Sequence, residues 1–421
     1  MTDVDQPRAG TAPGIDAAPG IDAAPAGDVG SRAPGASRAR VRAALAHRDP
    51  DRIPFDLGGT RVTGIHAHAY ERLRPVLGLE PREARIADIT QQLADVEPDV
   101  LDALGADVRC VSPRGSSTYH REICEEGGYR TFTDEWGVGR RMPLSQPLYY
   151  DSYAPPLPGD VDIADVAAYA WPDPADPARY AGMADEARRY AEGEGRAVAV
   201  GSICGGLTEG LFKLRGFEDG YMDLAGDPDL ARAVMERILA VKIGYWERAL
   251  PLLEGNVDVV AEADDLGGQE RPLFSPTTYR MLVKPLHREL FSWLHAHTDA
   301  KVFFHTCGAV RELIPDLIEI GVDILNPVQV SAAGMETAEL KREFGRDLVF
   351  WGGGVDTQRI LGAGTPDEVR AEVRRRVGDL SDREAGGPGG FVFAAVHNIQ
   401  PNVPAENILA MREALAEAAG G

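Results

Sequence analysis

Strand-like and helix-like segments alternate along the second half of the chain, and this alternation constrains the fold more than any other feature. Short apolar runs typical of buried strands are separated by longer amphipathic stretches typical of helices. The expected strands are Ala197–Ser202, Val257–Glu262, Lys301–His305, Ile324–Asn326, Leu348–Trp351 and Gly390–Val396. The expected helices are Asp229–Leu252, Pro276–His297, Ala309–Ile320, Thr337–Phe344, Pro366–Leu380 and Ala405–Ala418. This order predicts a parallel sheet connected by helices.

The number of these units favours a closed (β/α)8 TIM barrel, an α/β fold, over residues 39–421. Further strands near residues 53–57 and 105–112 complete the expected set. An open doubly wound sheet is the alternative. The glycine pattern of dinucleotide-binding sheets is absent. Gly352-Gly353-Gly354 follows an expected strand but lacks the glycine spacing of that pattern, and we expect it to form a tight loop at a barrel rim.

Residues 1–38 differ in composition from the rest of the chain. The sequence Gly14–Pro19 is repeated at once as Gly20–Pro25. Small residues and prolines bury too little apolar area to offset the loss of backbone entropy on folding. We therefore predict a disordered, low-complexity N-terminal tail over residues 1–38.

The charge and cysteine content narrow the choice of partners and compartment. The formal net charge of −22 repels phosphate backbones and anionic lipid, so we expect a small-molecule substrate and neither nucleic-acid nor membrane partners. No apolar run is long enough for a transmembrane helix. The four cysteines are scattered in a large chain without a secretory leader, which predicts free or metal-bound thiols in a reducing cytoplasm.

A His-x-Cys pair ends the apolar run that begins at Lys301. Because strand side chains alternate between faces, His305 and Cys307 point the same way and Phe304 points to the other face. An imidazole and a thiolate at the end of one strand form half of a zinc site. The alternative is that Cys307 is a small buried apolar residue and His305 a hydrogen-bonded histidine at the rim.

The active site of a TIM barrel lies at the C-terminal ends of its strands, so polar residues at these ends are candidates. We expect His397 at the inner rim, on the face shared by Phe391, Phe393 and Ala395. His305, Cys307 and His397 are then the predicted metal ligands, with zinc as the default ion for mixed N/S/O ligation. Glu262 and Asp264 share a face by period two and are predicted to be catalytic, as a fourth ligand or a general base.

Other polar residues near the ends of the strands have a structural or a substrate-binding interpretation. The acidic residues after the strand at 257–262 have a purely structural alternative, since Asp264 and Asp265 are suited to capping a helix. Polar residues at the remaining rims are predicted to bind substrate: Arg61, Asn326, Gln329, Gln358 and Gln400.

Several of these segments resemble the uroporphyrinogen decarboxylase superfamily. The resemblance rests on Asp264–Gly267, Phe304–Gly308, Gly321–Gln329, Phe350–Thr357 and Val396–Pro401, and residues 197–253 and Asp134–Gly137 are also similar. It implies a TIM barrel and one of two activities. One is the cofactor-free decarboxylation of uroporphyrinogen, and the other is zinc-dependent methyl transfer between a corrinoid protein and a thiol or related acceptor.

Two comparisons within the superfamily favour the methyltransferases. The decarboxylases carry a Met-Arg-Gln-Ala-Gly-Arg segment that binds substrate carboxylates, where this chain has Phe55–Arg61 with a different sequence. The methyltransferases use a His-x-Cys pair, matched by His305 and Cys307, and a distant second cysteine, in whose neighbourhood this chain has His397. The resemblance therefore implies a zinc-dependent methyltransferase or demethylase component, with cobalamin carried by a partner corrinoid protein.

The substitution of a histidine for the second cysteine leaves the reaction open. A neutral imidazole in place of a thiolate makes the metal a stronger Lewis acid and leaves a bound thiolate less electron-rich. The alternatives are a metal-dependent lyase or decarboxylase acting on a small organic acid, and a non-catalytic accessory subunit of a corrinoid protein.

Overall fold

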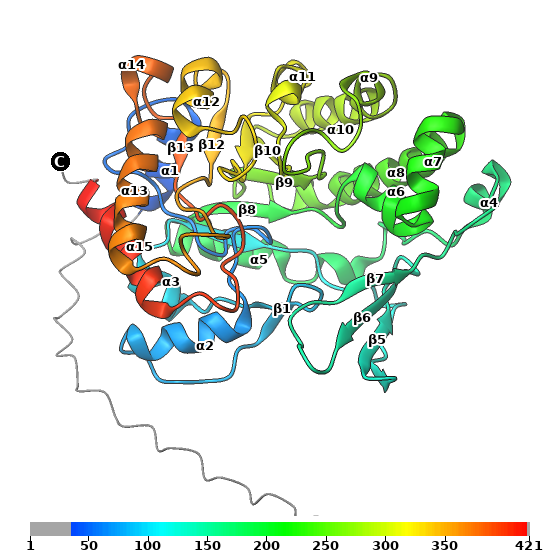
Figure 1. The fold of residues 1–421 in the computed structure, drawn as a ribbon, viewed down its shortest axis with the longest axis horizontal. Helices are drawn as coiled ribbons and strands as arrows, with labels where there is room; N and C mark the ends of the chain where they lie inside the picture. The colour runs from blue at the N-terminus through cyan, green and yellow to red at the C-terminus, as the bar shows by residue number, and fades with distance from the viewer. Residues whose placement is uncertain (1–34, 419–421) are drawn as a thin grey trace, which may run out of the picture. The chain divides into compact units, whose positions relative to one another are not determined.

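A computed structural model describes residues 35–418 (Figure 1). Residues 1–34, which make up most of the predicted tail, and residues 419–421 lie outside the described residues. Helix α1 spans Ala36–Leu45 and follows Gly35, whose φ of 86° places it in the left-handed region that favours glycine. The helix therefore begins within the last residues that the sequence assigned to the tail.

Seven parallel strands form the central sheet, in the order β13-β12-β11-β10-β9-β8-β3. Their bounds are β3 Val108–Val111, β8 Ala197–Gly201, β9 Val259–Ala263, β10 Lys301–His305, β11 Ile324–Asn326, β12 Val349–Trp351 and β13 Phe391–Val392. Residues 54–56 lie between the two edges of this sheet. Phe55 forms a parallel bridge with Phe393, and its carbonyl accepts a hydrogen bond from the Asp107 amide at 2.8 Å. The ring of eight confirms the predicted (β/α)8 barrel.

The strands are buried on both faces, which explains their continuous apolar runs. One set of side chains, including Ala199, Val259 and Phe303, fills the barrel interior together with Val41 and Leu45 of α1. The alternate set packs under the helices and includes Val198, Val200, Val260, Phe304 and Leu325. Helix α1 thus covers the N-terminal end of the barrel and leaves the C-terminal end, the mouth, for other groups.

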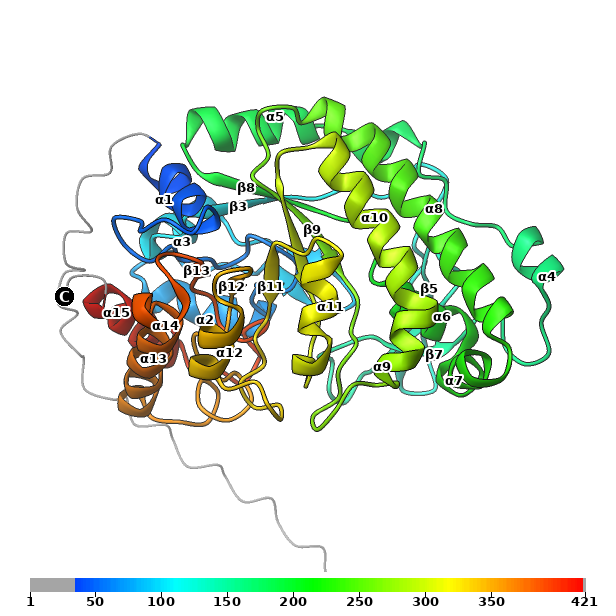
Figure 2. The ribbon, with the colours of Figure 1, turned by 90° about the horizontal axis from the view of Figure 1, so that it is seen from above.

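Helices surround the strands on the outside, as Figure 2 shows for α5, α8, α10, α11 and α12. The helices that follow the barrel strands are α5 Met183–Arg188, α6 Leu207–Arg215, α7 Phe217–Gly226, α8 Pro228–Leu252, α10 Lys284–His297, α11 Ile314–Glu319, α12 Thr337–Phe344, α13 Pro366–Leu380, α14 Arg383–Gly386 and α15 Ala405–Ala418. Helices α2 Ala67–Val76 and α3 Pro98–Leu104 precede β3. Within residues 35–418, no helix combines the length and apolarity that a membrane crossing requires.

An antiparallel sheet is inserted between β3 and β8 and projects beside the barrel (Figure 1). Its strands are β4 Cys124–Glu126, β5 Tyr129–Thr133, β6 Gly139–Pro143 and β7 Asp151–Ala154. The β5–β6 hairpin turns at Asp134, whose Oδ1 accepts hydrogen bonds from the amides of Trp136 and Val138 at 2.9 and 3.0 Å. A short pair, β1 Ile86–Asp88 and β2 Leu93–Ala94, lies earlier in the chain.

Several expected boundaries differ from the structure. Strand β13 ends at Val392 rather than at Val396, because Phe393 forms only a single bridge with Phe55 and the residues after it form isolated hydrogen bonds with the loop that follows β12. The expected helix 276–297 is α9 Pro276–Thr278, a π turn at Tyr279–Val283 and α10 in succession. Helix α4 Ile163–Ala168 lies between the inserted sheet and β8, and its start is stabilised by a capping box between Asp162 and Asp165.

Candidate metal centre

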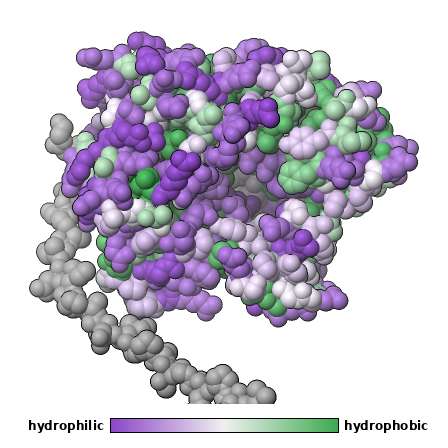
Figure 3. Space-filling view, viewed as in Figure 1, coloured by the Kyte–Doolittle hydropathy of each residue, from purple (hydrophilic) through white to green (hydrophobic). Residues whose placement is uncertain are grey.

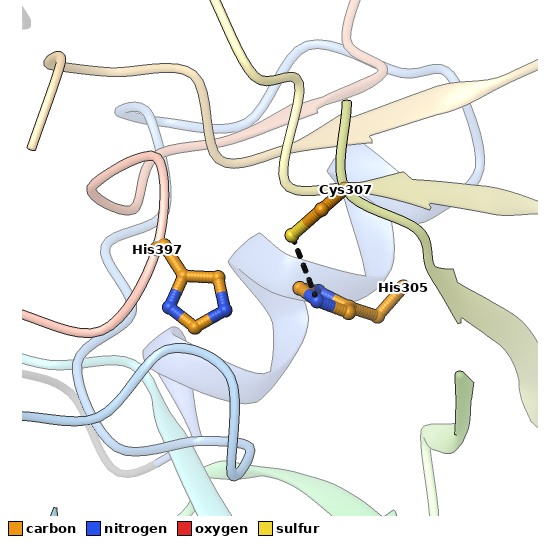
Figure 4. A group of neighbouring side chains, drawn as sticks. All are labelled: His305, Cys307 and His397. Carbon is orange, nitrogen blue, oxygen red and sulfur yellow. Dashed lines mark hydrogen bonds between the residues drawn. The ribbon is translucent and has the colours of Figure 1, made fainter. Parts of the chain in front are cut away.

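Three predicted ligands meet at the mouth of the barrel. His305, Cys307 and His397 each place one ligand atom within 4.8 Å of the other two, as Figure 4 shows. Cys307 Sγ lies 3.4 Å from His305 Nε2, and the rings of His305 and His397 are 5.3 Å apart at an angle of 67°. Within residues 35–418 this is the one group of three or more histidine, cysteine or acidic side chains arranged to hold a metal ion.

The orientation of His305 follows from its neighbours in the sheet. It is the last residue of β10 and pairs in register with Asn326, the last residue of β11. The Asn326 amide donates from Nδ2 to the carbonyl of Trp351 at 2.7 Å, so its Oδ1 faces His305 Nδ1 at 2.5 Å. Because Oδ1 only accepts, Nδ1 carries the hydrogen and Nε2 presents its lone pair to the cluster.

The electrostatics of the cluster suit a metal ion. Burial lowers the pKa of His397 to about 3, with a further contribution from His305, so its imidazole is neutral over the physiological range. Burial and the nearby Asp265 and Glu209 carboxylates raise the pKa of the Cys307 thiol well above its usual value. In the metal-free chain the thiol therefore keeps its hydrogen and donates it to His305 Nε2. A bound cation reverses this preference, since a coordinating thiol is deprotonated.

The donor set fits zinc. With Zn–S near 2.3 Å and Zn–N near 2.1 Å, tetrahedral ligand atoms lie roughly 3.5 Å apart. The 3.4 Å between Cys307 Sγ and His305 Nε2 matches this spacing, and the 4.8 Å limit for the whole group requires an approach of about 1 Å by the remaining ligand atom. Two imidazoles and one thiolate with a fourth position open are typical of a catalytic zinc site.

His397 reaches the cluster by a different route from the one expected. Phe391, Phe393 and Ala395 pack in the outer core under the helices, so their face is not the one that leads to the mouth. His397 lies beyond the end of β13, in a loop held by its neighbour Asn398. The Asn398 amide accepts from Gly64 N at 2.6 Å and donates to the Arg61 carbonyl at 3.0 Å.

The structure does not bring the predicted acids, Glu262 and Asp264, to the cluster. They share a face as expected, but it is the outer face, because Glu262 pairs in register with Phe304. Glu262 accepts hydrogen bonds at 2.5 to 2.9 Å from three groups, namely Lys242 Nζ, Trp246 Nε1 and Ser202 Oγ. Asp264 accepts from Thr208 N and Oγ1 and Glu209 N at the start of α6, which is the capping role named as its alternative.

Asp265 is the carboxylate that lies beside the cluster. Its Oδ1 is 3.7 Å from His305 Nε2 and accepts a hydrogen bond from the Cys307 amide at 2.8 Å. Burial, opposed by His305 and reinforced by Glu209, raises the pKa of this half-buried side chain. The signal that identifies it is parity: His305 faces inward and pairs with Ala263, so the inward series continues to position 265.

A cavity of about 480 Å³ lies next to the cluster and is bordered by His305, His397 and Asp265. The space-filling view shows a hollow near the centre of the drawn face, with hydrophilic and hydrophobic surface at its rim (Figure 3). Apolar walls come from several elements: Val62, Trp136, Val138, Ile203, Leu214, Ile238 and Phe303. Arg61, one of the predicted substrate-binding residues, also lines the cavity. Its guanidinium has no hydrogen-bond or ion-pair partner in the described part of the chain.

The other predicted substrate-binding residues are engaged in hydrogen bonds within the protein. Asn326 holds His305, and Gln329 Oε1 accepts from the Gly308 amide at 2.8 Å, which supports the turn after Cys307. Gln358 accepts from Ser331 Oγ at 3.2 Å, and Gln400 accepts from the Tyr149 hydroxyl. None of the four borders the cavity.

Sequence reasoning missed the residues that the inserted sheet and α6 contribute to the cavity. Trp136, Val138 and Arg140 come from the β5–β6 hairpin, and Glu209 and Lys213 from α6. Glu209 accepts from Lys213 Nζ at 3.2 Å and from the Gly206 amide at 3.1 Å. An i, i+4 Glu–Lys pair is typical of any exposed helix face, so the sequence carries no signal for this placement.

The fold and the cluster together define a TIM-barrel protein with a histidine–cysteine–histidine group at the catalytic end of the barrel. The family described as Uroporphyrinogen decarboxylase (URO-D) matches residues 146–418. This match covers more than half of the chain, and the chain belongs to that family. Its members include enzymes, which accords with a site at the mouth of the barrel.

Two known proteins are similar to the chain over much of its length. A "Uroporphyrinogen decarboxylase" of Roseiflexus sp. (strain RS-1) is 27% identical over 258 residues, 59% of this chain and 68% of that protein. The solved structure of a methyltransferase from Methanosarcina mazei superposes with a TM-score of 0.58 and 19% identity, covering 90% of this chain and 98% of that one. At this identity the second similarity establishes the fold.

Proposed function

We propose that the protein is a zinc-dependent methyltransferase or demethylase component that moves a methyl group between a corrinoid protein and a small-molecule acceptor. The observation that carries the proposal is the convergence of His305, Cys307 and His397 within 4.8 Å beside a cavity. The family contains enzymes, and the superposed methyltransferase from Methanosarcina mazei supports this choice within it.

The residues of the chain have distinct roles in this proposal. His305 Nε2, Cys307 Sγ and the His397 imidazole hold the ion, which supplies Lewis-acid chemistry that lowers the pKa of a thiol or hydroxyl acceptor. Asp265 lies next to His305 and borders the cavity, so it is placed to take the proton that the acceptor loses. Arg61 offers its free guanidinium to an anionic group of the substrate.

The transfer balances without any further reactant. The acceptor heteroatom forms a bond to the methyl carbon, and the cobalt–carbon bond of the methylated corrinoid breaks with its electron pair remaining on cobalt. The proton of the acceptor passes to Asp265 and then to solvent. Trp136 and Phe303 give the cavity an apolar wall against which a methyl group can pack.

A second candidate function is a lyase or decarboxylase acting on a small organic acid. Arg61 favours it, because an unpaired arginine in a cavity is suited to a substrate carboxylate. The curated relative named as a decarboxylase is consistent with this class. The two candidates differ in one requirement: the lyase turns over an isolated acid, whereas methyl transfer needs a corrinoid.

Metal analysis of the purified protein tests the proposal. We expect about one zinc per chain in the wild type, and its loss in Cys307→Ala and His305→Ala. Cys204→Ala is the matched control, because Cys204 also lines the cavity but lies outside the cluster. Full zinc occupancy in Cys307→Ala contradicts the ligand assignment.

The reaction is tested with methylcobalamin as the methyl donor and a panel of small thiols carrying carboxylate or sulfonate groups. Loss of methylcobalamin absorbance that depends on zinc and on Cys307 supports methyl transfer. Release of carbon dioxide from small carboxylic acids without cobalamin favours the lyase. A protein that binds zinc and a corrinoid protein but turns over neither panel is the accessory subunit.

A further inference from the structure

The hydrogen bond between Asn326 and His305 assigns a role that the sequence did not suggest. We infer that Asn326 is a positioning residue, which fixes the tautomer and the ring orientation of His305 so that Nε2 is free to bind the metal. This inference rests on the metal site proposed above, and it concerns the second layer of residues around that site. Asn326 does not border the cavity, so the role differs from the substrate binding predicted for it.

The Asn326 side chain has no alternative orientation. It is 0% exposed and ends a barrel strand. Its Nδ2 donates to the Trp351 carbonyl at 2.7 Å and its Oδ1 accepts from His305 Nδ1 at 2.5 Å. Rotating the amide by 180° turns its oxygen towards the Trp351 carbonyl, so these two buried oxygens face each other without a donor, whichever tautomer His305 adopts.

Trp351 is itself anchored, so the carbonyl that orients Asn326 does not shift. It lies in β12, fully buried, and its ring nitrogen donates to Asp56 Oδ2 at 2.8 Å. The Asp56 carboxylate also accepts from the Gly59 amide at 2.8 Å. A chain of hydrogen bonds therefore runs from the loop that follows residues 54–56, through β12 and β11, to His305 on β10.

The chemical character of the partner is as informative as its position. A metal-bound histidine usually donates its second N–H to a carboxylate, a carbonyl or water, and such partners orient the ring and tune its basicity. The Asn326 amide orients His305 without adding negative charge, so it leaves the imidazole a weaker electron donor than a carboxylate does. His397 is likewise a neutral ligand, so both residues leave the bound ion a strong Lewis acid.

The test compares Asn326→Asp with Asn326→Leu. The Asp side chain still accepts from Nδ1, and full burial favours a proton on its second oxygen, which then donates to the Trp351 carbonyl as Nδ2 does. We therefore expect zinc affinity to be retained, whereas Leu removes the acceptor and lowers affinity 10- to 100-fold. Competition with a chromophoric chelator measures both. Asn407→Leu is the matched control, since Asn407 is equally buried and donates to the Leu361 and Gly364 carbonyls outside the cluster.

A second measurement needs no metal. Long-range ¹⁵N–¹H correlation spectra of the zinc-free protein with labelled histidine report which ring nitrogen carries the hydrogen. We expect the Nδ1–H form for His305 in the wild type and in Asn407→Leu, and a shift towards Nε2–H in Asn326→Leu. A purely structural role for Asn326 lowers stability without changing this ratio.

The outcomes separate the two levels of the argument. A wild type with His305 in the Nε2–H form overturns the inference, even if zinc binds. A wild type in the Nδ1–H form that takes up no zinc supports the orientation by Asn326 and overturns the metal function. Equal loss of zinc affinity in Asn326→Asp and Asn326→Leu also overturns the inference, and it does so even if Asn326→Leu alone folds poorly.

Discussion

The two ends of the barrel differ in the pairing of some of their charged side chains. At the N-terminal end, Asp107 is fully buried and accepts from Ser37, Arg40 and Arg52 at 2.7 to 2.9 Å. Asp258 nearby pairs with two arginines of α1. At the mouth, Arg61 has no such partner within residues 35–418, and the half-buried Asp265 is paired with no lysine or arginine there. The difference indicates that one end stabilises the fold and the other is kept for ligands.

Removing Asp107 is expected to give the largest change in stability. Asp107→Ala leaves the buried donors of Ser37 and the Phe55 amide without an acceptor and removes one of the two partners of Arg40, which keeps its pair with Asp51. Breaking such a buried network by removing one partner costs about 3–5 kcal/mol. We expect the free energy of unfolding to fall by that amount in urea titrations. Zinc affinity of the folded fraction is expected to stay unchanged.

The mouth provides the matched control for this variant. Asp265→Ala removes one hydrogen bond, with the Cys307 amide, and relieves a half-buried carboxylate, so we expect a change of at most about 1 kcal/mol. Turnover, not stability, is the property it is expected to lose. Equal destabilisation by the two variants contradicts the division of roles between the ends of the barrel.

Asp56 is a buried carboxyl group whose effect on stability is expected to depend on pH. It is 1% exposed, forms no ion pair within the described residues, and burial raises its pKa to about 6. The folded chain therefore holds this proton more tightly than the unfolded chain, whose aspartate pKa is near 3.9. The stability that Asp56 contributes is fully present below about pH 4 and is lost as the pH rises through 6, up to a limit of about 3 kcal/mol.

Comparing wild type with Asp56→Asn isolates this effect, because all other titrating groups are shared. We expect the unfolding free energy of the wild type to decline relative to that of Asp56→Asn between pH 4 and 6, and the difference to stay constant above 7. Urea titrations at four or five pH values measure it. A difference that is independent of pH shows that Asp56 is ionised with an ordinary pKa, and the charge is then compensated.

The sequence predicted those features that depend on one strand alone. Strands β10 and β11 have the expected bounds, because their apolar runs end at a polar residue that lies at the rim. The shared face of His305 and Cys307 follows from strand periodicity and is found in the structure. The sequence did not predict the end of β13, since residues 393–396 are also apolar but form only a single bridge and isolated hydrogen bonds.

Features that depend on the register between strands could not be predicted from the sequence. Periodicity places Glu262 and Asp264 on one face, but only the pairing of Ala263 with His305 shows that this face is the outer one. Asn326 is a rim residue in the sequence, and its role becomes visible only when β11 lies beside β10. Such pairings join residues about 20 to 40 positions apart, and no local pattern encodes them.

Replacing Arg61 is expected to give the smallest change in stability, and it tests whether an unpaired charge at the mouth serves to bind a ligand. An arginine without a partner is available to a substrate anion, so Arg61→Gln is expected to raise the KM for an anionic substrate 10- to 100-fold, equivalent to about 1.5–3 kcal/mol for a charged hydrogen bond. The unfolding free energy is expected to change by less than about 0.5 kcal/mol. Benzoate serves as a probe anion for calorimetric titration.

Arg140 is the control that makes this outcome decisive. It also lines the cavity, but its guanidinium donates to Asp134 at 2.8 Å and to Ser152 at 2.6 Å. If pairing decides the role of a charge, Arg140→Gln lowers stability and leaves the binding of the anion nearly unchanged, the reverse of Arg61→Gln. If both variants weaken binding equally, position in the cavity matters more than pairing, and the free guanidinium of Arg61 loses its significance as the mark of a substrate site.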